Sequence, residues 1–222
     1  MARITINPTS SGLWHVEGLG DELRRSRERE KESWAAAADM RFEAVQRLVD
    51  VLGEEEVHLD WEHRPTRAAM ELLYAAAADQ FVVGETETAA ALWETLLEVD
   101  EEDHMSVSVL LAFCYVELED YDCWDEMMFS ISPKTPEYHL LTLWAEYRRT
   151  GEIPDGEVRV LSFKHRLFFE EFRAVEHPID EEYLNGLEAE PPTRQAQARQ
   201  LWLQTENLWA LHTDFIEALR EK

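Results

Sequence analysis

The stretch LLYAAAADQFVVGETETAAALWETLLEVD, residues 72–100, decides the fold of this chain. Its first part is rich in strong helix formers and ends at Gly84, a residue type that commonly terminates helices. Its second part predicts another helix, which ends at the acidic run Asp100–Asp103. The segment LLYAAAADQF has apolar residues on more than one face. The helix pair therefore cannot bury them alone and has to stack on neighbours.

Helical patterns continue on both sides of this pair. Toward the N-terminus, apolar residues follow the spacing of one helical face, at Ala38, Phe42, Val45, Val49 and Leu52. In all, helices are expected over residues 21–53, 65–84, 85–99, 105–119, 120–131, 137–150, 157–176 and 193–222. The last is long for one helix, and a break near Thr205–Asn207 is compatible with it. No strand pattern appears in the second half, so the predicted class is all-α.

The division of the chain follows from the same pattern. Residues 1–20 are expected to form an N-terminal tail or a short strand over RITI, residues 3–6. Residues 21–64 are expected to form an N-terminal helix and a linker, and residues 65–222 a helical array with C-terminal capping helices. We expect 21–64 and 65–222 to share one domain, since 222 residues are within reach of a single core.

Similar features recur at about 32–35 residues, the period of helix-turn-helix repeats. The later units read SVLLAFCYVELEDYDCWDEMMFSISPKTP and LLTLWAEYRRTGEIPDGE. These units resemble tetratricopeptide repeats, with small residues, turn glycines and a terminal proline in the family's positions at Ala77, Ala112, Ala89, Gly84, Gly151 and Pro136. Trp124 and Trp144 stand where the family has small residues, so helix packing there has to be looser or shifted. The resemblance implies a right-handed solenoid with flanking capping helices.

The resemblance also implies a binding groove on the concave face of the array. The family's groove positions correspond here to mainly apolar and aromatic residues, among them Tyr74, Phe81, Val109, Phe113, Tyr138 and Arg148. Chaperone-binding members hold a C-terminal carboxylate with Lys, Asn and Arg at these slots, and because the slots are mainly apolar and aromatic here, we expect that clamp to be absent. We therefore predict a groove for an apolar or amphipathic peptide or helix of a partner protein. The alternative is a structural or self-associating protein whose own N-terminal segment fills the groove.

Charge restricts the partners further. The chain carries 47 acidic against 21 basic residues, a formal charge of −26, which disfavours nucleic acid and anionic membranes and favours a basic partner. The segment RRSREREK, residues 24–31, is interleaved with glutamates and predicts an ion-paired helix that can dock within the monomer or in a homodimer. Only four bases are lysines, so a salt-accumulating source is one hypothesis. With no apolar run of about 18 residues and no signal-like N-terminus, we expect a cytoplasmic protein.

Two segments attract attention as chemical sites. HLDWEH, residues 58–63, contains His58, Asp60, Glu62 and His63, and an enzyme or metal protein using this His58–His63 cluster is a rival reading. Asp100–Asp103 lacks the glycine and ligand alternation of a calcium loop, so a solvated turn that favours the start of the next helix is expected. No nucleophile motif or phosphate loop occurs. We predict no catalytic residue, no metal ligand and no cofactor.

Overall fold

The computed structural model describes residues 3–53 and 56–222 of the chain. Within these residues there are 12 helices and one two-stranded sheet, so the predicted all-α class is confirmed. None of the described helices is long and apolar enough to cross a membrane. The chain divides into two compact units, Met1–Leu111 and Ala112–Lys222. Residues 1–2 of the expected tail and 54–55 of the expected linker lie outside the described residues.

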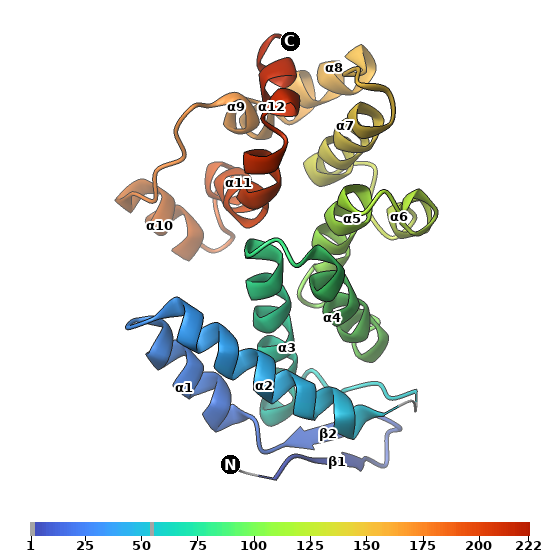
Figure 1. Ribbon diagram of the computed structural model, residues 1–222, viewed down its shortest axis with the longest axis vertical. Coiled ribbons are helices and arrows are strands. Elements are labelled where there is room, and N and C mark those ends of the chain that lie inside the picture. Colours follow the sequence, from blue (N-terminus) through green and yellow to red (C-terminus); the bar gives the residue numbers. More distant parts are fainter. Residues whose placement is uncertain (1–2, 54–55) are drawn as a thin grey trace. The chain divides into compact units, whose positions relative to one another are not determined.

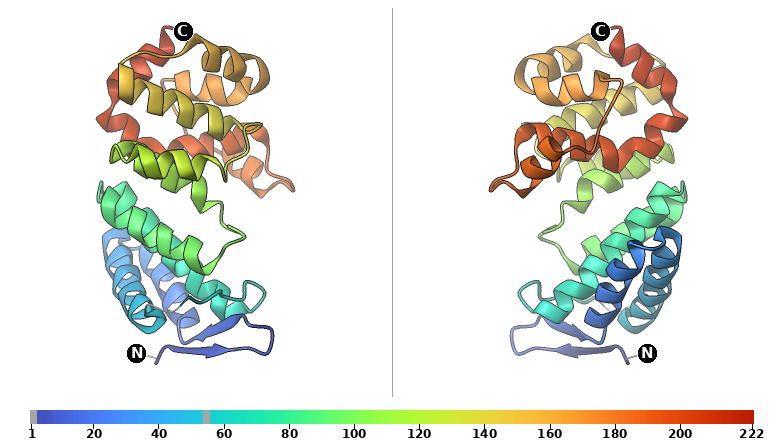
Figure 2. Two further views of the ribbon diagram at one scale, coloured as in Figure 1. Left: turned by 90° about the vertical axis from the view of Figure 1, so that its right-hand side faces the viewer. Right: turned by 90° about the vertical axis from the view of Figure 1, so that its left-hand side faces the viewer.

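The first unit begins with an antiparallel hairpin of β1 (Thr5–Pro8) and β2 (Trp14–Glu17), whose register runs from Thr5↔Glu17 to Pro8↔Trp14. Figure 2 shows the two strands running alongside each other. The chain leaves the hairpin through Gly18, where φ is +100° and an added Cβ would lie 2.6 Å from the backbone oxygen of Arg3. Only glycine fits such a position without strain.

Four helices complete most of the first unit: α1 (Gly20–Glu30), α2 (Trp34–Leu52), α3 (Arg64–Val82) and α4 (Thr86–Val99). Figure 1 shows α1 and α2 side by side, and both contact α3. The helix expected over residues 21–53 is in fact two helices, because Ser33 begins a new one by accepting a hydrogen bond from the Ala36 N–H at 3.3 Å.

The helix pair predicted over residues 65–99 is present as α3 and α4. Pro65 lies in the first turn of α3, where its missing N–H costs nothing, and Gly84 turns the chain at φ +84°. The side chains of Phe81 and Trp93 pack with ring centroids 5.4 Å apart and bury the interface between α3 and α4. A helix-turn-helix pair of this kind is the unit of the predicted solenoid, and the repeat itself stays a prediction.

The boundary between the units falls within α5 (Val107–Glu117). The second unit continues with α6 (Tyr121–Met128), α7 (Pro136–Thr150), α8 (Asp155–Lys164), α9 (Arg166–Arg173), α10 (Glu181–Glu188), α11 (Arg194–Leu211) and α12 (Thr213–Arg220). The helices expected over 157–176 and 193–222 are each divided, at His165 and at His212. Both breaks lack proline and glycine, and the second differs from the position expected near Thr205–Asn207.

The core of the second unit is aromatic. Trp209 lies at its centre, with its ring edge-to-face to Trp144 at 5.4 Å and 83° and to Phe113 at 5.8 Å and 82°. Phe172 and Phe215 contact the same ring. Edge-to-face pairs of this kind add stabilisation beyond the area that they bury.

Candidate functional site

The six residues predicted to contact a partner are shared between the two units. In the first unit, Phe81 is 1% exposed and packs against Trp93, whereas Tyr74 and Val109 are half-buried. A fully buried ring offers no surface to a partner. Phe81 therefore serves the core in this structure, and the prediction that it contacts a ligand does not fit its position.

The second unit gives a similar answer. Phe113 is fully buried against Trp209, so it too belongs to the core. Tyr138 is half-buried. Arg148 donates hydrogen bonds to the Glu117 and Glu119 carboxylates at 2.7 and 3.0 Å. Its guanidinium is thus already neutralised within the unit, which leaves little free charge for a partner.

The acidic run forms the expected turn between α4 and α5, but the prediction that it is solvated is wrong for Asp100, which is buried. Asp103 adopts φ +48°, and its carboxylate accepts hydrogen bonds from the N–H groups of Val107 and Ser108 at 2.6 and 3.1 Å. These bonds satisfy N–H groups that the first turn of α5 leaves without helical partners. Glu101 and Glu102 remain exposed.

Backbone hydrogen bonds bring the HLDWEH segment close to the acidic run. The Trp14 N–H donates to the His58 oxygen at 2.8 Å, and the Asp60 N–H donates to the Trp14 oxygen at 3.0 Å. The Leu59 N–H then donates to the Val99 oxygen at 2.8 Å. HLDWEH is therefore not a free linker, because it lies between β2 and the end of α4.

A cavity of about 350 Å³ lies where the two segments meet. We call it the acid–tryptophan cavity. Three kinds of side chain line it. They are the apolar Leu13, Leu59 and Val99, the acidic Asp60, Glu62, Asp100, Glu101 and Glu102, and the aromatic His58, Trp61 and His104. Leu59 and Val99 are buried and supply apolar surface, whereas the three glutamates, Leu13 and His104 are exposed. A volume of this size is at the lower end of the range for small-ligand sites.

The buried carboxylate of the cavity is paired. Asp100 is 5% exposed at its side chain and accepts a hydrogen bond from the His104 ring at 2.7 Å, which raises the pKa of His104. The His104 ring in turn stacks on Trp61 at 4.7 Å and 7°. The guanidinium of Arg67 lies 5.6 Å from the centroid of the same indole. Trp61 is thus held by two neighbours.

A second histidine pair supports the cavity from the hairpin side. The His15 ring contacts the Asp60 carboxylate at 2.9 Å and lowers the pKa of Asp60. His15 also stacks on His63 at 3.7 Å and 6°, and the His63 ring contacts the Thr66 hydroxyl at 2.7 Å. Within residues 3–53 and 56–222, no group of three or more His, Cys, Asp or Glu is placed to hold a metal ion.

The second unit contains a buried carboxylate that sequence reasoning missed. The Glu171 side chain is 2% exposed, and it accepts hydrogen bonds from Arg199, from the His177 ring at 2.8 Å and from Gln195 at 3.0 Å. The hydrogen bond between Arg199 and Glu171 raises the pKa of Arg199. In sequence, Glu171 is one glutamate of EE within a charged helix, and nothing distinguishes it from Glu170.

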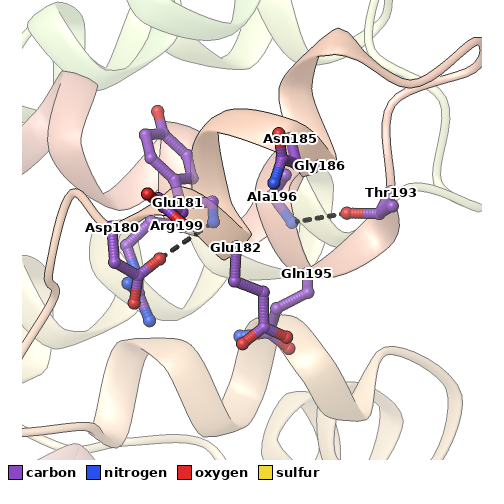
Figure 3. A pocket seen from close by; sticks show the side chains of 10 residues that line it. Asp180, Glu181, Glu182, Asn185, Gly186, Thr193, Gln195, Ala196 and Arg199 are labelled. Carbon is purple, nitrogen blue, oxygen red and sulfur yellow. Dashed lines mark hydrogen bonds between the residues drawn. The ribbon is translucent and has the colours of Figure 1, made fainter.

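An open cavity of about 950 Å³ lies beside this carboxylate, along α10 and α11 (Figure 3). Figure 3 shows Asp180 accepting a hydrogen bond from the backbone at the start of α10 and Thr193 doing the same at the start of α11. Arg199 lines the cavity but is engaged by Glu171. Of the polar groups of this cavity, Asp180 and Thr193 are therefore engaged in helix capping and Arg199 in the ion pair with Glu171.

Comparison of the chain with protein-family models, with curated proteins and with solved structures finds no match. The functional assignment therefore rests on the geometry of these sites.

Proposed function

We propose that this chain is a protein-interaction module built of tetratricopeptide-like helix pairs, and that its first unit binds a cationic side chain of a partner protein in the acid–tryptophan cavity. The α3–α4 pair, with its turn at Gly84, supports the repeat part of the proposal. The net charge of −26 supports a basic partner, which the field of the protein would attract over long range.

The observation that carries the proposal is the composition of the cavity. Its buried lining is apolar at Leu59 and Val99, and its exposed lining carries Glu62, Glu101 and Glu102. Arg and Lys have the complementary form, an apolar stem that ends in a charged head. The stem would contact the apolar surface while the head reaches the carboxylates.

The volume favours one side chain over an extended peptide. A cavity of about 350 Å³ accommodates a single long side chain, and the rest of a partner would lie on the surface outside it. This revises the predicted mechanism, because the apolar residues Phe81 and Phe113 are buried in their own units. In the proposed mechanism, the basic residues that we expect in the partner from the negative charge of this chain make the principal contact.

One observation favours the alternative of a self-filled array. The N-terminal hairpin packs against α3, where the Val16 N–H donates to the Thr66 hydroxyl at 2.9 Å. The N-terminal segment therefore covers part of the first unit. It leaves the acid–tryptophan cavity open, so the two readings are compatible.

Fluorescence anisotropy with a labelled arginine-containing peptide tests the proposal. The same peptide with citrulline in place of arginine keeps the shape and removes the charge, and we expect it to bind about tenfold more weakly, as for the loss of one charge-assisted hydrogen bond. The double variant Glu101→Gln/Glu102→Gln should weaken the arginine peptide similarly. This effect should shrink as salt rises.

The matched control is Glu181→Gln/Glu182→Gln, which changes the net charge equally at the cavity of the second unit. It should leave affinity nearly unchanged. If both double variants weaken binding to the same extent, attraction is general and the acid–tryptophan cavity is not the site.

A further inference from the structure

The His104 ring presents its two nitrogens to two carboxylates at the acid–tryptophan cavity. Nδ1 lies 2.7 Å from Oδ1 of Asp100, and Nε2 lies 3.3 Å from Oε2 of Glu102. The two acids differ in exposure, since the Asp100 side chain is 5% exposed and the Glu102 side chain 83%. The His104 ring, itself 29% exposed, therefore joins a buried acid to an exposed acid of the cavity lining.

The buried acid fixes the tautomer of the neutral ring. One Asp100 oxygen accepts from the backbone N–H of His104 at 3.1 Å, and the other faces Nδ1. Because an ionised carboxylate only accepts, Nδ1 carries the proton of the neutral ring, and Nε2 holds a lone pair. That lone pair faces the Glu102 carboxylate, which also only accepts. Two acceptors this close repel each other unless a donor serves both.

Two donors can serve this pair of acceptors. One is a proton on Nε2, which makes the His104 ring cationic and pairs it with Glu102. The other is the cationic head of a bound side chain, because the N–H groups of a guanidinium diverge and can reach two neighbouring acceptors. A side chain that reaches Glu102 is therefore within reach of Nε2 as well. The proton and the cationic head cannot both occupy this place.

We propose that Nε2 of the neutral His104 ring accepts a hydrogen bond from the partner's cationic side chain, so that this side chain and a proton compete for one nitrogen. This role of His104 rests on the proposed function, because it requires a cation in the acid–tryptophan cavity. The partner is then held at neutral and alkaline pH and released in acid. Linkage is reciprocal, so the bound cation lowers the pKa of His104 by as much as protonation weakens binding.

The acids around His104 bring this competition close to neutral pH. The hydrogen bond with Asp100 raises the pKa of His104 from its ordinary value, and the charges of Glu102 and Glu62 raise it further. Glu62 comes from the HLDWEH segment, on the other side of the cavity from the acidic run. Protonation of His104 therefore begins at a milder pH than that of an isolated histidine.

The other groups facing His104 include one cation. The guanidinium of Arg67, from α3, lies 5.6 Å from the centroid of the Trp61 indole, on which the His104 ring stacks at 4.7 Å. Across the cavity, the titratable groups of the lining are Asp60, Glu101 and His58. The lining holds five acids and, among the described residues, no Lys or Arg. These surroundings favour a positive charge at this place, whether the proton or the partner brings it.

Calorimetric titration of the full chain with a capped peptide, whose only ionisable group is one arginine, tests the competition. Between about pH 5.5 and 8.5, ordinary carboxylates and arginine keep their charges. We expect the affinity to be constant above the pKa of His104 and to fall below it by up to about tenfold per pH unit, as displacement of one proton requires. Buffers of different ionisation enthalpy should also reveal the released proton.

The wild type provides a second measurement that needs no variant to fold. In an NMR titration of the histidine rings, the saturating arginine peptide should lower the pKa of His104 by about one unit or more, the equivalent of tenfold weaker binding to the protonated ring. The citrulline peptide, which has no charge, should change this pKa much less.

The variant His104→Asn keeps a donor for Asp100 and removes Nε2. Its affinity for the arginine peptide should be nearly independent of pH, and at about pH 8.5 it should be about tenfold below that of the wild type, as for one lost charge-assisted hydrogen bond. The matched control is His58→Asn, which removes the other histidine of the same lining. It should retain the pH dependence of the wild type.

The possible results separate this role of His104 from the proposed function. If the arginine peptide binds with an affinity that is constant over this pH range or increases in acid, the competition is refuted and the cationic side-chain site stands. The competition is also refuted if His58→Asn, and not His104→Asn, removes the pH dependence, or if the peptide leaves the pKa of His104 unchanged. If the peptide binds at no pH, both proposals fail.

Discussion

Replacing Arg41 with methionine tests whether the first unit depends on a buried ion pair. The Arg41 side chain is 4% exposed and that of Asp79 8%, and the guanidinium donates to both Asp79 oxygens at 2.5 and 2.8 Å. Methionine retains the apolar stem but leaves the Asp79 carboxylate buried without its partner. Breaking a buried pair on one side costs about 3–5 kcal/mol, a large part of the stability of a small domain.

The dependence of this loss on pH has a definite sign. Burial raises the pKa of Asp79 even in the wild type, and removing Arg41 removes the attraction that opposes this effect. In the variant, the folded protein then binds a proton at Asp79 more tightly than the unfolded chain does. The variant therefore regains stability as the pH falls from the raised folded pKa of Asp79 toward the ordinary value. Above the raised pKa the loss of stability is complete.

Urea unfolding of Arg41→Met, combined with hydrogen exchange of peptides from α2 and α3, measures the loss where it occurs. The control is Arg24→Met, since the Arg24 side chain is 58% exposed and its ion pairs are on the surface. The double variant Arg41→Met/Asp79→Leu should recover most of the stability. The reasoning fails if Arg41→Met costs no more than Arg24→Met, or if the loss does not diminish in acid.

Three further outcomes are expected from the same physical arguments. Glu171→Gln, which removes a buried carboxylate and leaves the part-buried Arg199 without it, should lower the unfolding free energy by about 3–5 kcal/mol in calorimetry, whereas the exposed Glu170→Gln should change it little. Asp100→Asn should bring the raised pKa of His104 back toward its ordinary value in an NMR titration, and the stability that this contact provides is complete at acidic pH and lost as pH rises through the folded pKa. Gly18→Ala should destabilise the protein by about 1–3 kcal/mol in thermal unfolding, because φ is +100° and the new Cβ would meet a backbone oxygen at 2.6 Å.

Residue types that end helices made part of the fold predictable. Pro65, Gly84 and Gly151 begin or end helices α3 and α7 where the sequence places them, because each restricts or frees the backbone in a known way. The breaks at His165 and His212 could not be found in this way. At both, the helix stops without proline or glycine, so no residue type marks the position in the sequence.

The candidate site was predictable in its residues but not in its assembly. Charge and aromatic content distinguish residues 58–63 and 100–104 separately, and the sequence predicts that each connects two helices. A single backbone bond from Leu59 to the oxygen of Val99 makes them neighbours. Backbone groups are the same in every residue, so no sequence pattern reports that bond. The only sign of the stacking between Trp61 and His104 in the sequence is weak, because it consists of two aromatic rings in polar loops.

The backbone hydrogen bonds at Trp14, Leu59 and Val99 also affect how this protein can change during evolution. Main-chain hydrogen bonds survive most substitutions, so the frame of the acid–tryptophan cavity does not depend on which side chains line it. Mutations at exposed lining positions such as Glu101 and Glu102 can therefore alter the charge of the cavity at little cost to folding. A chain with the same hairpin and α4 turn would be expected to keep the cavity while its charge changes, and with the charge the side chain that we propose it binds.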